Sequence, residues 1–256
     1  MALELQFLGT GNAPQVPVYN CYCKACQRAR LEPRFKRGPC SVALLIDGQQ
    51  WLIDGGCTDL CERFPAPLLK GILQTHYHAD HAQGLLHLRW GTKLSIPVWG
   101  PNDPQGFADL YKHPGILDFS QPWAEFESRR IGGATVTAVP LNHSKLCLGY
   151  VIEHDGVCVA YLTDTVGLPQ RTHDWLTTKQ LNYCIVDCSE PPAEQTPRNH
   201  NDVNSALAMC DGLSIQHLIF THIGHELDEW LMAHAAQLPS HVDIAFDGMH
   251  LQLSVD

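Results

Sequence analysis

The sequence predicts an α/β protein with two β-sheets and helices on their outer faces. Short runs rich in Val, Ile, Leu and Tyr alternate with helical stretches along the 256 residues. Many of the strand-like runs are separated by hairpin-length turns. The chain has no Gly/Ser-rich linker, internal repeat or low-complexity tract. We therefore expect one domain over residues 1–256.

The expected strands share Gly, Pro, Asn or Asp near their ends. They cover Leu3–Gly9, Ser41–Ile46, Gln50–Ile53, Ile72–Thr75, Ala134–Val139, Gly149–His154, Val157–Thr163, Tyr183–Asp187, Leu218–Thr221 and Asp243–Leu253. The expected helices cover His81–Trp90, Gln105–Lys112, Gln170–Lys179, Asp202–Asp211 and Asp228–Gln237. Asn102 and Asn201 stand just before two of these helices, where capping residues are expected.

Composition limits the classes of function. Apolar residues make up 45% and charged residues 17%, as in ordinary globular proteins. A net charge of −10 disfavours binding to nucleic acid or to an anionic membrane surface, but bound metal ions could still attract a small anionic substrate. No apolar run approaches the ~20 residues that cross a bilayer. With 11 cysteines and no visible signal peptide, we expect a cytoplasmic protein with reduced or metal-bound thiols.

The strongest motif is His76-x-His78-x-Asp80-His81, between an apolar strand and a helix. His76 and His78 are two residues apart in an extended stretch, so their side chains point to the same side. Asp80 and His81 fall on the following turn and can reach a second point nearby. Imidazoles and carboxylates are ligands for Zn²⁺, Mn²⁺ or Fe²⁺. The motif therefore predicts a metal-dependent hydrolase.

One turn cannot supply two coordination spheres, so further ligands should follow other strands. His143, Asp164 and His222 each come directly after an apolar β-run. A single residue in such a position is more often a cap or turn residue than a ligand. Three of them, in a chain that already carries the central motif, favour ligands.

This order of residues resembles the metallo-β-lactamase superfamily. The resemblance implies a four-layer αβ/βα sandwich with two metal ions in a groove at one edge. It implies one site made of His76, His78 and His143, a second made of Asp80, His81 and His222, and Asp164 bridging the two. Asp80 is thereby also expected to take part in catalysis. Asp54, in an Asp-Gly turn, matches a residue that supports the ligands from behind.

A second cluster, Cys21-x-Cys23-x-x-Cys26, follows the first strand within an insertion around residues 20–40. Four soft ligands around one structural Zn²⁺ would explain three closely spaced thiols. We expect His225 as the fourth ligand. The alternative is a loop whose cysteines have no joint role. The remaining cysteines stand mostly in apolar context and are expected to be small core residues.

Five further segments indicate which branch of the superfamily the sequence resembles. They lie at 89–91, 113–119, 141–146, 197–200 and 246–249 and resemble the phosphodiesterases of the carbon–phosphorus lyase pathway. The resemblance implies hydrolysis of 5-phospho-α-D-ribosyl 1,2-cyclic phosphate to α-D-ribose 1,5-bisphosphate in phosphonate degradation. It also implies two Mn²⁺ in the active site, with Zn²⁺, Ni²⁺ or Fe²⁺ as substitutes, one structural Zn²⁺ and a homodimer.

Hydrolysis of a phosphodiester also needs an acid and phosphate-binding groups. His200, in a polar loop before a helix, is our candidate for protonating the leaving alkoxide. The alternative is a loop histidine without a role. Candidate phosphate donors are Ser144, Lys145, Arg198 and Arg89.

Four other functions remain open at this point. The chain could act on 2′,3′-cyclic nucleotides or RNA 3′ ends. It could process transfer RNA, although it lacks the basic arm that this requires. It could be a relative from cofactor biosynthesis with a similar cysteine cluster, which should lack some of the dinuclear ligands. It could also be an inactive zinc scaffold, which incomplete ligands would favour.

Overall fold

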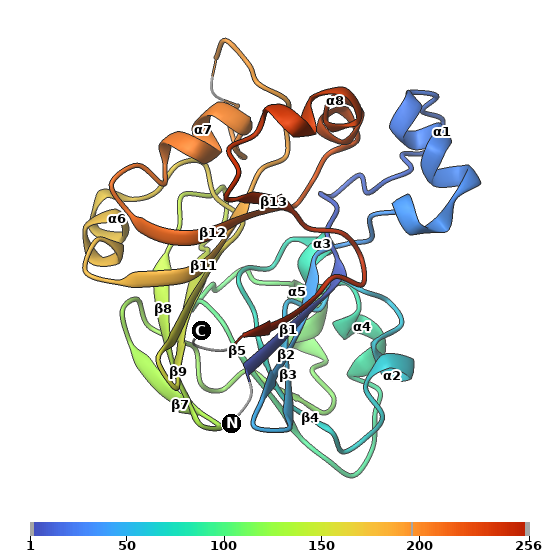
Figure 1. Cartoon of the computed structure of the whole chain (residues 1–256). Helices are drawn as coiled ribbons and strands as arrows, with labels where there is room; N and C mark the ends of the chain where they lie inside the picture. Colours follow the sequence, from blue (N-terminus) through green and yellow to red (C-terminus); the bar gives the residue numbers. More distant parts are fainter. Residues whose placement is uncertain (1–2, 196, 254–256) are drawn as a thin grey trace.

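Two seven-stranded sheets form the centre of the computed structural model, which describes residues 3–195 and 197–253 (Figure 1). The first sheet has the order β14-β1-β2-β3-β4-β5-β6, with strands β1 (Leu3–Gly9), β2 (Ser41–Ile46), β3 (Gln49–Ile53), β4 (Leu69–Leu73), β5 (Ile96–Trp99), β6 (Leu117–Asp118) and β14 (His250–Leu253). The second has the order β13-β12-β11-β10-β9-β8-β7, with strands β7 (Ser128–Ile131), β8 (Ala134–Pro140), β9 (Leu148–His154), β10 (Val157–Leu162), β11 (Gln180–Asp187), β12 (Ser214–Thr221) and β13 (Val242–Ile244).

Each sheet is antiparallel on one side and parallel on the other. In the first sheet the pairs from β14 to β3 are antiparallel and those from β3 to β6 are parallel. In the second, β7 to β10 are antiparallel and β10 to β13 are parallel. Chain segments that leave parallel strands return over the outer face of the sheet, and this places helices there.

The helices complete four layers. They are α1 (Lys24–Leu31), α2 (Leu60–Arg63), α3 (Ala79–Ala82), α4 (Leu85–Leu88), α5 (Ala108–Lys112), α6 (Gln170–Leu176), α7 (Val203–Ala208) and α8 (His225–His234), with 3₁₀ turns at Pro33–Phe35 and Ala235–Gln237. One core, including Phe7, Val136 and Ile152, fills the space between the sheets. Two further cores lie under α2, α4 and α5 on one outer face and under α6, α7 and α8 on the other. The predicted αβ/βα sandwich is therefore confirmed.

The predicted helix His81–Trp90 is wrong as a single element, because it consists of α3 and α4 separated by a turn. The backbone N–H of Gly84 donates to Gly55 O at 2.8 Å instead of continuing the helix. A Cβ on Gly84 would lie 1.9 Å from Cys57 O, so the approach requires glycine. This contact holds the metal motif against the turn that follows β3.

The predicted strand Asp243–Leu253 is also wrong as one unit. It divides into β13 and β14, which belong to different sheets. The turn between them contains Gly248, at φ 92°, and Asp247, which accepts hydrogen bonds from Thr10 N and Gly38 N. Prediction also missed α1, α2 and β5 to β7, which are short or have a mixed polar sequence.

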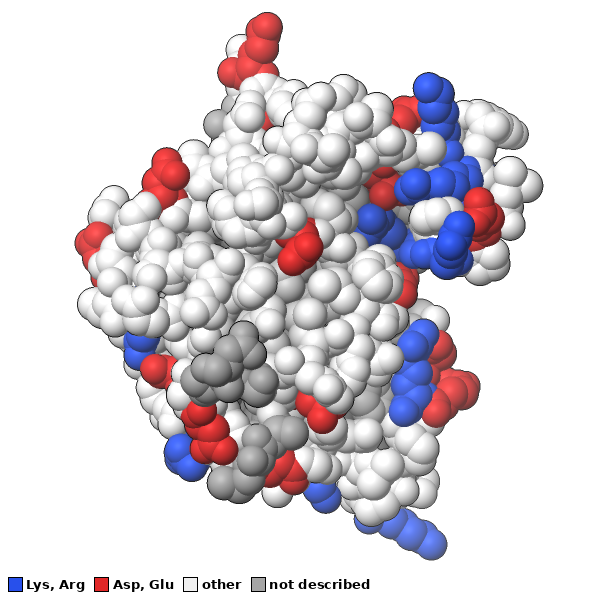
Figure 2. All heavy atoms as spheres, viewed as in Figure 1, with Lys and Arg blue, Asp and Glu red and all other residues white. Residues whose placement is uncertain are grey.

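Residues 17–37, which we call the cysteine lobe, are inserted between β1 and β2 and pack on α8 (Figure 1). The lobe has six of the chain's 17 Lys and Arg residues, and Figure 2 shows blue side chains gathered there. Two of these cations hold the lobe in place, because Arg28 and Arg37 each form an ion pair with Asp228 of α8 at 3.0 Å. Among the described residues, no helix has the length and apolar character needed to cross a membrane.

Candidate active site

The predicted ligands lie together at the carboxyl ends of several central strands. His76, His78, Asp80 and His81 lie between β4 and the end of α3. His143 follows β8, Asp164 follows β10 and His222 follows β12 directly. These seven side chains form two overlapping groups. Within each group, the ligand atoms all lie within 4.8 Å of one another. Asp164 belongs to both groups.

The first group contains His76, His78, His143 and Asp164. His78 Nδ1 lies 2.9 Å from His76 Nε2 and 3.0 Å from His143 Nε2. Asp164 Oδ2 is 3.7 Å from His76 Nε2 and 3.8 Å from His143 Nε2. Three nitrogens and one carboxylate oxygen thus surround one point, as ligands of a single metal ion do.

The second group contains Asp80, His81, Asp164 and His222. The Nε2 atoms of His81 and His222 both lie 3.3 Å from Asp164 Oδ2. Asp80 Oδ2 is 3.6 Å from His81 Nε2 and 3.3 Å from His222 Nε2. One oxygen of Asp164 therefore faces both groups, which is the position of a bridging ligand.

In three of the histidines, Nδ1 already has a hydrogen-bond partner outside the centre. This leaves Nε2 as the nitrogen that can bind a metal ion. His81 Nδ1–H donates to Asp54 Oδ2 at 2.7 Å. His76 Nδ1–H donates to Thr75 Oγ1 at 3.0 Å, since that hydroxyl donates to Asp54. His222 Nδ1 lies 2.9 Å from Ser189 Oγ. The Nε2 atoms of all three rings consequently face the centre.

The fit to a metal ion has independent support. His81 Nε2 is buried and has no hydrogen-bond partner among the described residues. A buried polar atom without a partner is costly unless something unseen satisfies it. A divalent cation at this point would accept the lone pair, and the neighbouring nitrogens and carboxylates would complete its sphere.

Asp54 occupies the supporting position that the sequence predicts. It directly follows β3 at a positive φ of 59° and is fully buried. Its carboxylate accepts from Thr75 N at 2.8 Å, from Gln74 Nε2 at 3.1 Å and from His81. It therefore orients one histidine and the backbone of the metal motif together.

The electrostatics of the cluster favour a bound cation. Burial and the neighbouring His143 lower the pKa of His78 to about 4, and burial with the other histidines holds the pKa of His76 well below its usual value. Burial acts against ionised Asp80, but its hydrogen bond from His222 outweighs this and lowers the pKa of Asp80 to about 2. For His222, burial opposes protonation, yet Asp164 and Asp187 raise its pKa to about 10. The carboxylates thus attract positive charge, which a divalent ion can supply in place of protons.

His200 lies beside the centre, where the sequence predicts an acid. Its ring is 4.8 Å from the ring of His222 and 5.4 Å from that of His143, measured between centroids. His200 Nδ1 is 2.8 Å from Asp187 Oδ2. Burial tends to lower the pKa of His200, but the hydrogen bond and charge of Asp187 outweigh burial and raise it. This pairing favours the protonated imidazole that a proton donor requires.

Asp187 is a functional candidate that the sequence reasoning missed. It is fully buried at the end of β11 and also accepts from Thr165 N and Ser189 Oγ. Through Ser189 it is linked to His222, and directly to His200. The signal was available, because an ionisable residue after an apolar strand is the pattern that singled out Asp164.

The structure also brings the cysteine cluster together with His225. His225 Nδ1 lies 3.5 Å from Cys21 Sγ and 3.6 Å from Cys23 Sγ, and Cys26 completes a group within 4.8 Å. His225 is the first residue of α8, three positions after the ligand His222. Six of the other cysteines are buried, as expected, whereas Cys61 is exposed and Cys210 half-buried.

The predicted phosphate donors divide into two sets. Ser144 and Lys145 line a groove of about 600 Å³ that also reaches His143. Arg198 is exposed one residue before Asn199, whose carbonyl lies 3.3 Å from His143 Nδ1. The guanidinium of Arg89 instead pairs with Asp109 at 2.7 Å and donates to two backbone carbonyls of the α5 region. Both terminal nitrogens of Arg89 are thus engaged within the fold, and its Nε is buried without a partner among the described residues.

Comparison with known proteins agrees with this geometry. Residues 58–223 match the beta-lactamase superfamily domain, so the chain belongs to the metallo-β-lactamase superfamily. A crystal structure of a diphosphatase of the PhnP family superposes with a TM-score of 0.82 at 25% identity, covering 99% of this chain and 98% of that one. The chain thus has a metallo-hydrolase fold that resembles the PhnP family and implies divalent metal binding.

Other relatives belong to different branches. Coenzyme PQQ synthesis protein B from Methylorubrum extorquens is 28% identical over 213 residues, which are 66% of this chain and 67% of that protein. Its namesake from Rhodopseudomonas palustris is 30% identical over 107 residues, so the match spans only 35% of that protein and 37% of this chain. The Zn²⁺-bound PqqB structure from Methylobacterium extorquens shares the fold, with a TM-score of 0.80 at 19% identity over 98% of this chain and 100% of that one.

The Cys₃His group gives a direct prediction. We propose that this group binds a structural zinc ion, so Cys23→Ser should remove one zinc ion per chain and lower the free energy of unfolding, because such a site contributes to folding. Cys61→Ser, which changes an exposed cysteine outside the cluster, is the matched control. Elemental analysis and urea unfolding measure the two effects. A Cys23→Ser protein with the parent's zinc content and stability would contradict the site.

Proposed function

We propose that this chain is a metal-dependent phosphodiesterase that converts 5-phospho-α-D-ribosyl 1,2-cyclic phosphate to α-D-ribose 1,5-bisphosphate in phosphonate degradation. The observation that carries the proposal is the pair of complete ligand groups sharing Asp164 Oδ2. The resemblance to the PhnP family supports this branch of the superfamily. The small anionic phosphodiester is the proposed partner, and we propose a homodimer as the assembly.

The donor set fits two divalent ions. We propose Mn²⁺ in both groups, with Zn²⁺, Ni²⁺ or Fe²⁺ able to replace it, and Zn²⁺ among the cysteines, since nitrogen and oxygen ligands accept all of these ions. When bound, two ions there activate a water molecule and neutralise charge on the phosphoryl oxygens. Asp80 and Asp164 supply the negative charge that holds the ions.

The chain's own residues then supply orientation and a proton. Asp187 holds Nδ1 of His200, so the opposite nitrogen of the ring is the one that can face a substrate. His200 gives its proton to the ribosyl oxygen as the P–O bond breaks. The oxygen therefore leaves as a hydroxyl group and not as an unprotonated alkoxide. Asp187 stabilises the charged imidazolium before this transfer.

We propose Ser144 and Lys145 as the main donors to the substrate's second phosphate, since they line the groove beside His143. Lys145 Nζ lies 3.3 Å from Gly106 O and 3.8 Å from Asp103, so it is positioned but still half-exposed. Arg198 is a further donor, because its guanidinium has no ion-pair or hydrogen-bond partner in the described part of the chain. Arg89 is not among the proposed donors, because its guanidinium is held by Asp109 of α5.

Two alternatives keep some support from the relatives. The likeness to protein B of PQQ synthesis would favour a role in cofactor biosynthesis. The likeness to human tRNase Z, with a TM-score of 0.69 at 19% identity over 98% of this chain, extends to the fold alone. The complete dinuclear ligand set counts against the first alternative, and the −10 charge counts against the second.

The substrate assignment predicts a preference. We expect kcat/KM for 5-phosphoribosyl 1,2-cyclic phosphate to exceed that for a ribonucleoside 2′,3′-cyclic phosphate, because only the first presents a second phosphate to Lys145 and Ser144. Formation of the phosphomonoester product, followed by ³¹P NMR or anion-exchange chromatography with the metal-loaded protein, measures both rates. Equal or faster turnover of the nucleoside substrate would argue against the pathway.

The proposed role of His200 predicts a dependence on the leaving group. His200→Ala should lower kcat by about 10²–10⁴-fold for the ribosyl substrate, whose alkoxide needs a proton. The loss should be small for bis(p-nitrophenyl) phosphate, whose phenolate leaves unaided. His241→Ala, an exposed histidine elsewhere, is the control. Equal losses on both substrates would show that His200 does not act as the acid.

A further inference from the structure

Residues 222–225, which we call the connecting segment, join the dinuclear centre to the Cys₃His group. His222 follows β12 directly and belongs to the second group of the centre, whereas His225 is the first residue of α8. Only Ile223 and Gly224 separate the two histidines. Figure 1 shows the cysteine lobe, with α1, beside α8 at this side of the molecule. The proposed reaction uses neither His225 nor the cysteines.

The position of His225 fits a ligand of a zinc ion held by the cysteines. Its Nδ1 lies 3.5 Å from Cys21 Sγ and 3.6 Å from Cys23 Sγ. Tetrahedral zinc has bonds of about 2.3 Å to sulfur and about 2.0–2.1 Å to nitrogen, so two such ligand atoms lie about 3.5–3.6 Å apart. The observed spacing matches this edge of a tetrahedron. A bound zinc ion would therefore fix the start of α8 to the cysteine lobe.

The backbone of His222 depends on its surroundings. Its φ is 60°, in the left-handed region that residues other than glycine rarely adopt. Such a conformation persists only where neighbouring contacts hold it. Ser189 supplies two of these contacts, because its Oγ lies 2.7 Å from the carbonyl oxygen of His222 and 2.9 Å from Nδ1. The remaining support comes from the residues that follow His222 in the chain.

The two residues between the histidines leave little room for adjustment. Ile223 is fully buried, and its N–H donates at 2.8 Å to a backbone carbonyl of the turn after β1. Gly224 N donates to Ser189 O at 3.1 Å. A Cβ on Gly224 would lie 2.5 Å from Ser189 O, so the segment passes too close to this carbonyl for a larger residue. A displacement of His225 would consequently move His222, because the residues between them cannot take up the change.

Ion pairs hold the lobe on α8 independently of His225. Asp228, on the same helix, pairs with both Arg28 and Arg37 at 3.0 Å. Glu229, the next residue, accepts from Lys24 N at 2.9 Å. These contacts keep the lobe in place when His225 is replaced, so a substitution there acts on the connecting segment itself.

We propose that His225 is a positioning residue for the dinuclear centre: tied to the cysteines through zinc, it holds His222 in the conformation that binds a metal ion. Occupancy of the Cys₃His group thereby raises the metal affinity of the second group, which contains His222, and leaves the first group, which does not, largely unchanged. The inference rests on the proposed metal sites and goes beyond the proposed reaction, because metal binding is measured without substrate.

The test is Mn²⁺ binding by His225→Ala. The electron paramagnetic resonance signal of free Mn²⁺ gives the dissociation constant of each ion in protein supplied with one equivalent of zinc. One of the two Mn²⁺ ions should bind about tenfold or more weakly than in the parent protein, as is typical when a residue that orients a metal ligand is lost. His225→Cys, which keeps four zinc ligands, should retain the parent's affinities. His234→Ala, at the other end of α8, is the matched control and should change neither.

Two further backgrounds identify the weakened ion. In His78→Ala, which damages the first group, the added His225→Ala substitution should weaken the remaining ion by the same factor. In His222→Ala, where the connecting segment has no ligand to position, His225→Ala should change nothing. Withdrawal of zinc from the parent protein should reproduce the selective effect without any substitution.

Two results would overturn the proposal. Unchanged affinities for both ions, in His225→Ala or in the zinc-free parent protein, would show that the connecting segment carries no coupling. Equal weakening of both ions would show a general loosening of the fold, because only the second group contains His222.

The outcome is also separate from the proposed function. Selective weakening in a protein that hydrolyses neither cyclic phosphate would keep the role of His225 and remove the proposed reaction. Hydrolysis of the ribosyl substrate by a protein whose Mn²⁺ affinities ignore His225 would keep the reaction and remove the positioning role.

Discussion

The buried carboxylate of Asp164 is the constraint on which the rest of the site depends. It is 1% exposed, and one of its oxygens faces the Nε2 atoms of four histidines. Burial acts to raise the pKa of Asp164, but the nearby His222 and His81 outweigh burial and hold it well below its usual value. A charge in this position is stable only if positive charge accompanies it. Divalent metal ions held by the surrounding ligands would supply that charge, which explains why ligands from both sheets converge there.

The outer contacts of the ligands make this convergence rigid. Asp54 holds His81 and Thr75, and Thr75 in turn accepts from His76. Ser189 and Asp187 perform the same task for His222 and His200 in the other sheet. His76, His81 and His222 are thereby oriented before a metal binds, which improves affinity and catalytic geometry. The two sheets contribute equivalent arrangements. In each, a buried aspartate at the end of a strand orients a histidine at the centre.

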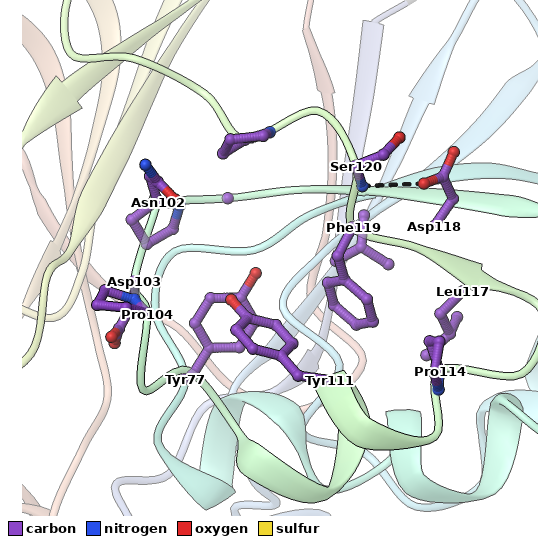
Figure 3. A pocket seen from close by; sticks show the side chains of 14 residues that line it. Tyr77, Asn102, Asp103, Pro104, Tyr111, Pro114, Leu117, Asp118, Phe119 and Ser120 are labelled. Atoms are coloured by element: carbon purple, nitrogen blue, oxygen red, sulfur yellow. Dashed lines mark hydrogen bonds between the residues drawn. The ribbon is translucent and has the colours of Figure 1, made fainter.

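Sequence patterns singled out residues that the fold brings together, because the His76–His81 motif, His143, Asp164 and His222 all come after apolar strands, and strand ends are visible in the order of residues. The two layers of sheet followed from the alternation of strands and helices. The break between α3 and α4 was not predictable, because it depends on the contact of Gly84 with Gly55, 29 positions away. The division of residues 243–253 between two sheets likewise depends on which strands they pair with. The contacts among the rings of Tyr77, Tyr111 and Phe119 (Figure 3) were also not predictable, because these residues are separated in sequence and meet only through packing.

Metal stoichiometry tests the central claim most directly. The protein reconstituted with Mn²⁺ and Zn²⁺ and freed of loosely bound ions should contain three metal ions per chain, two at the Asp164 centre and one among the cysteines. Asp164→Ala should lose both ions of the centre and keep the zinc, because Asp164 contributes to both spheres. A parent protein that holds a single ion besides the zinc, or an Asp164→Ala variant that keeps two, would contradict the account.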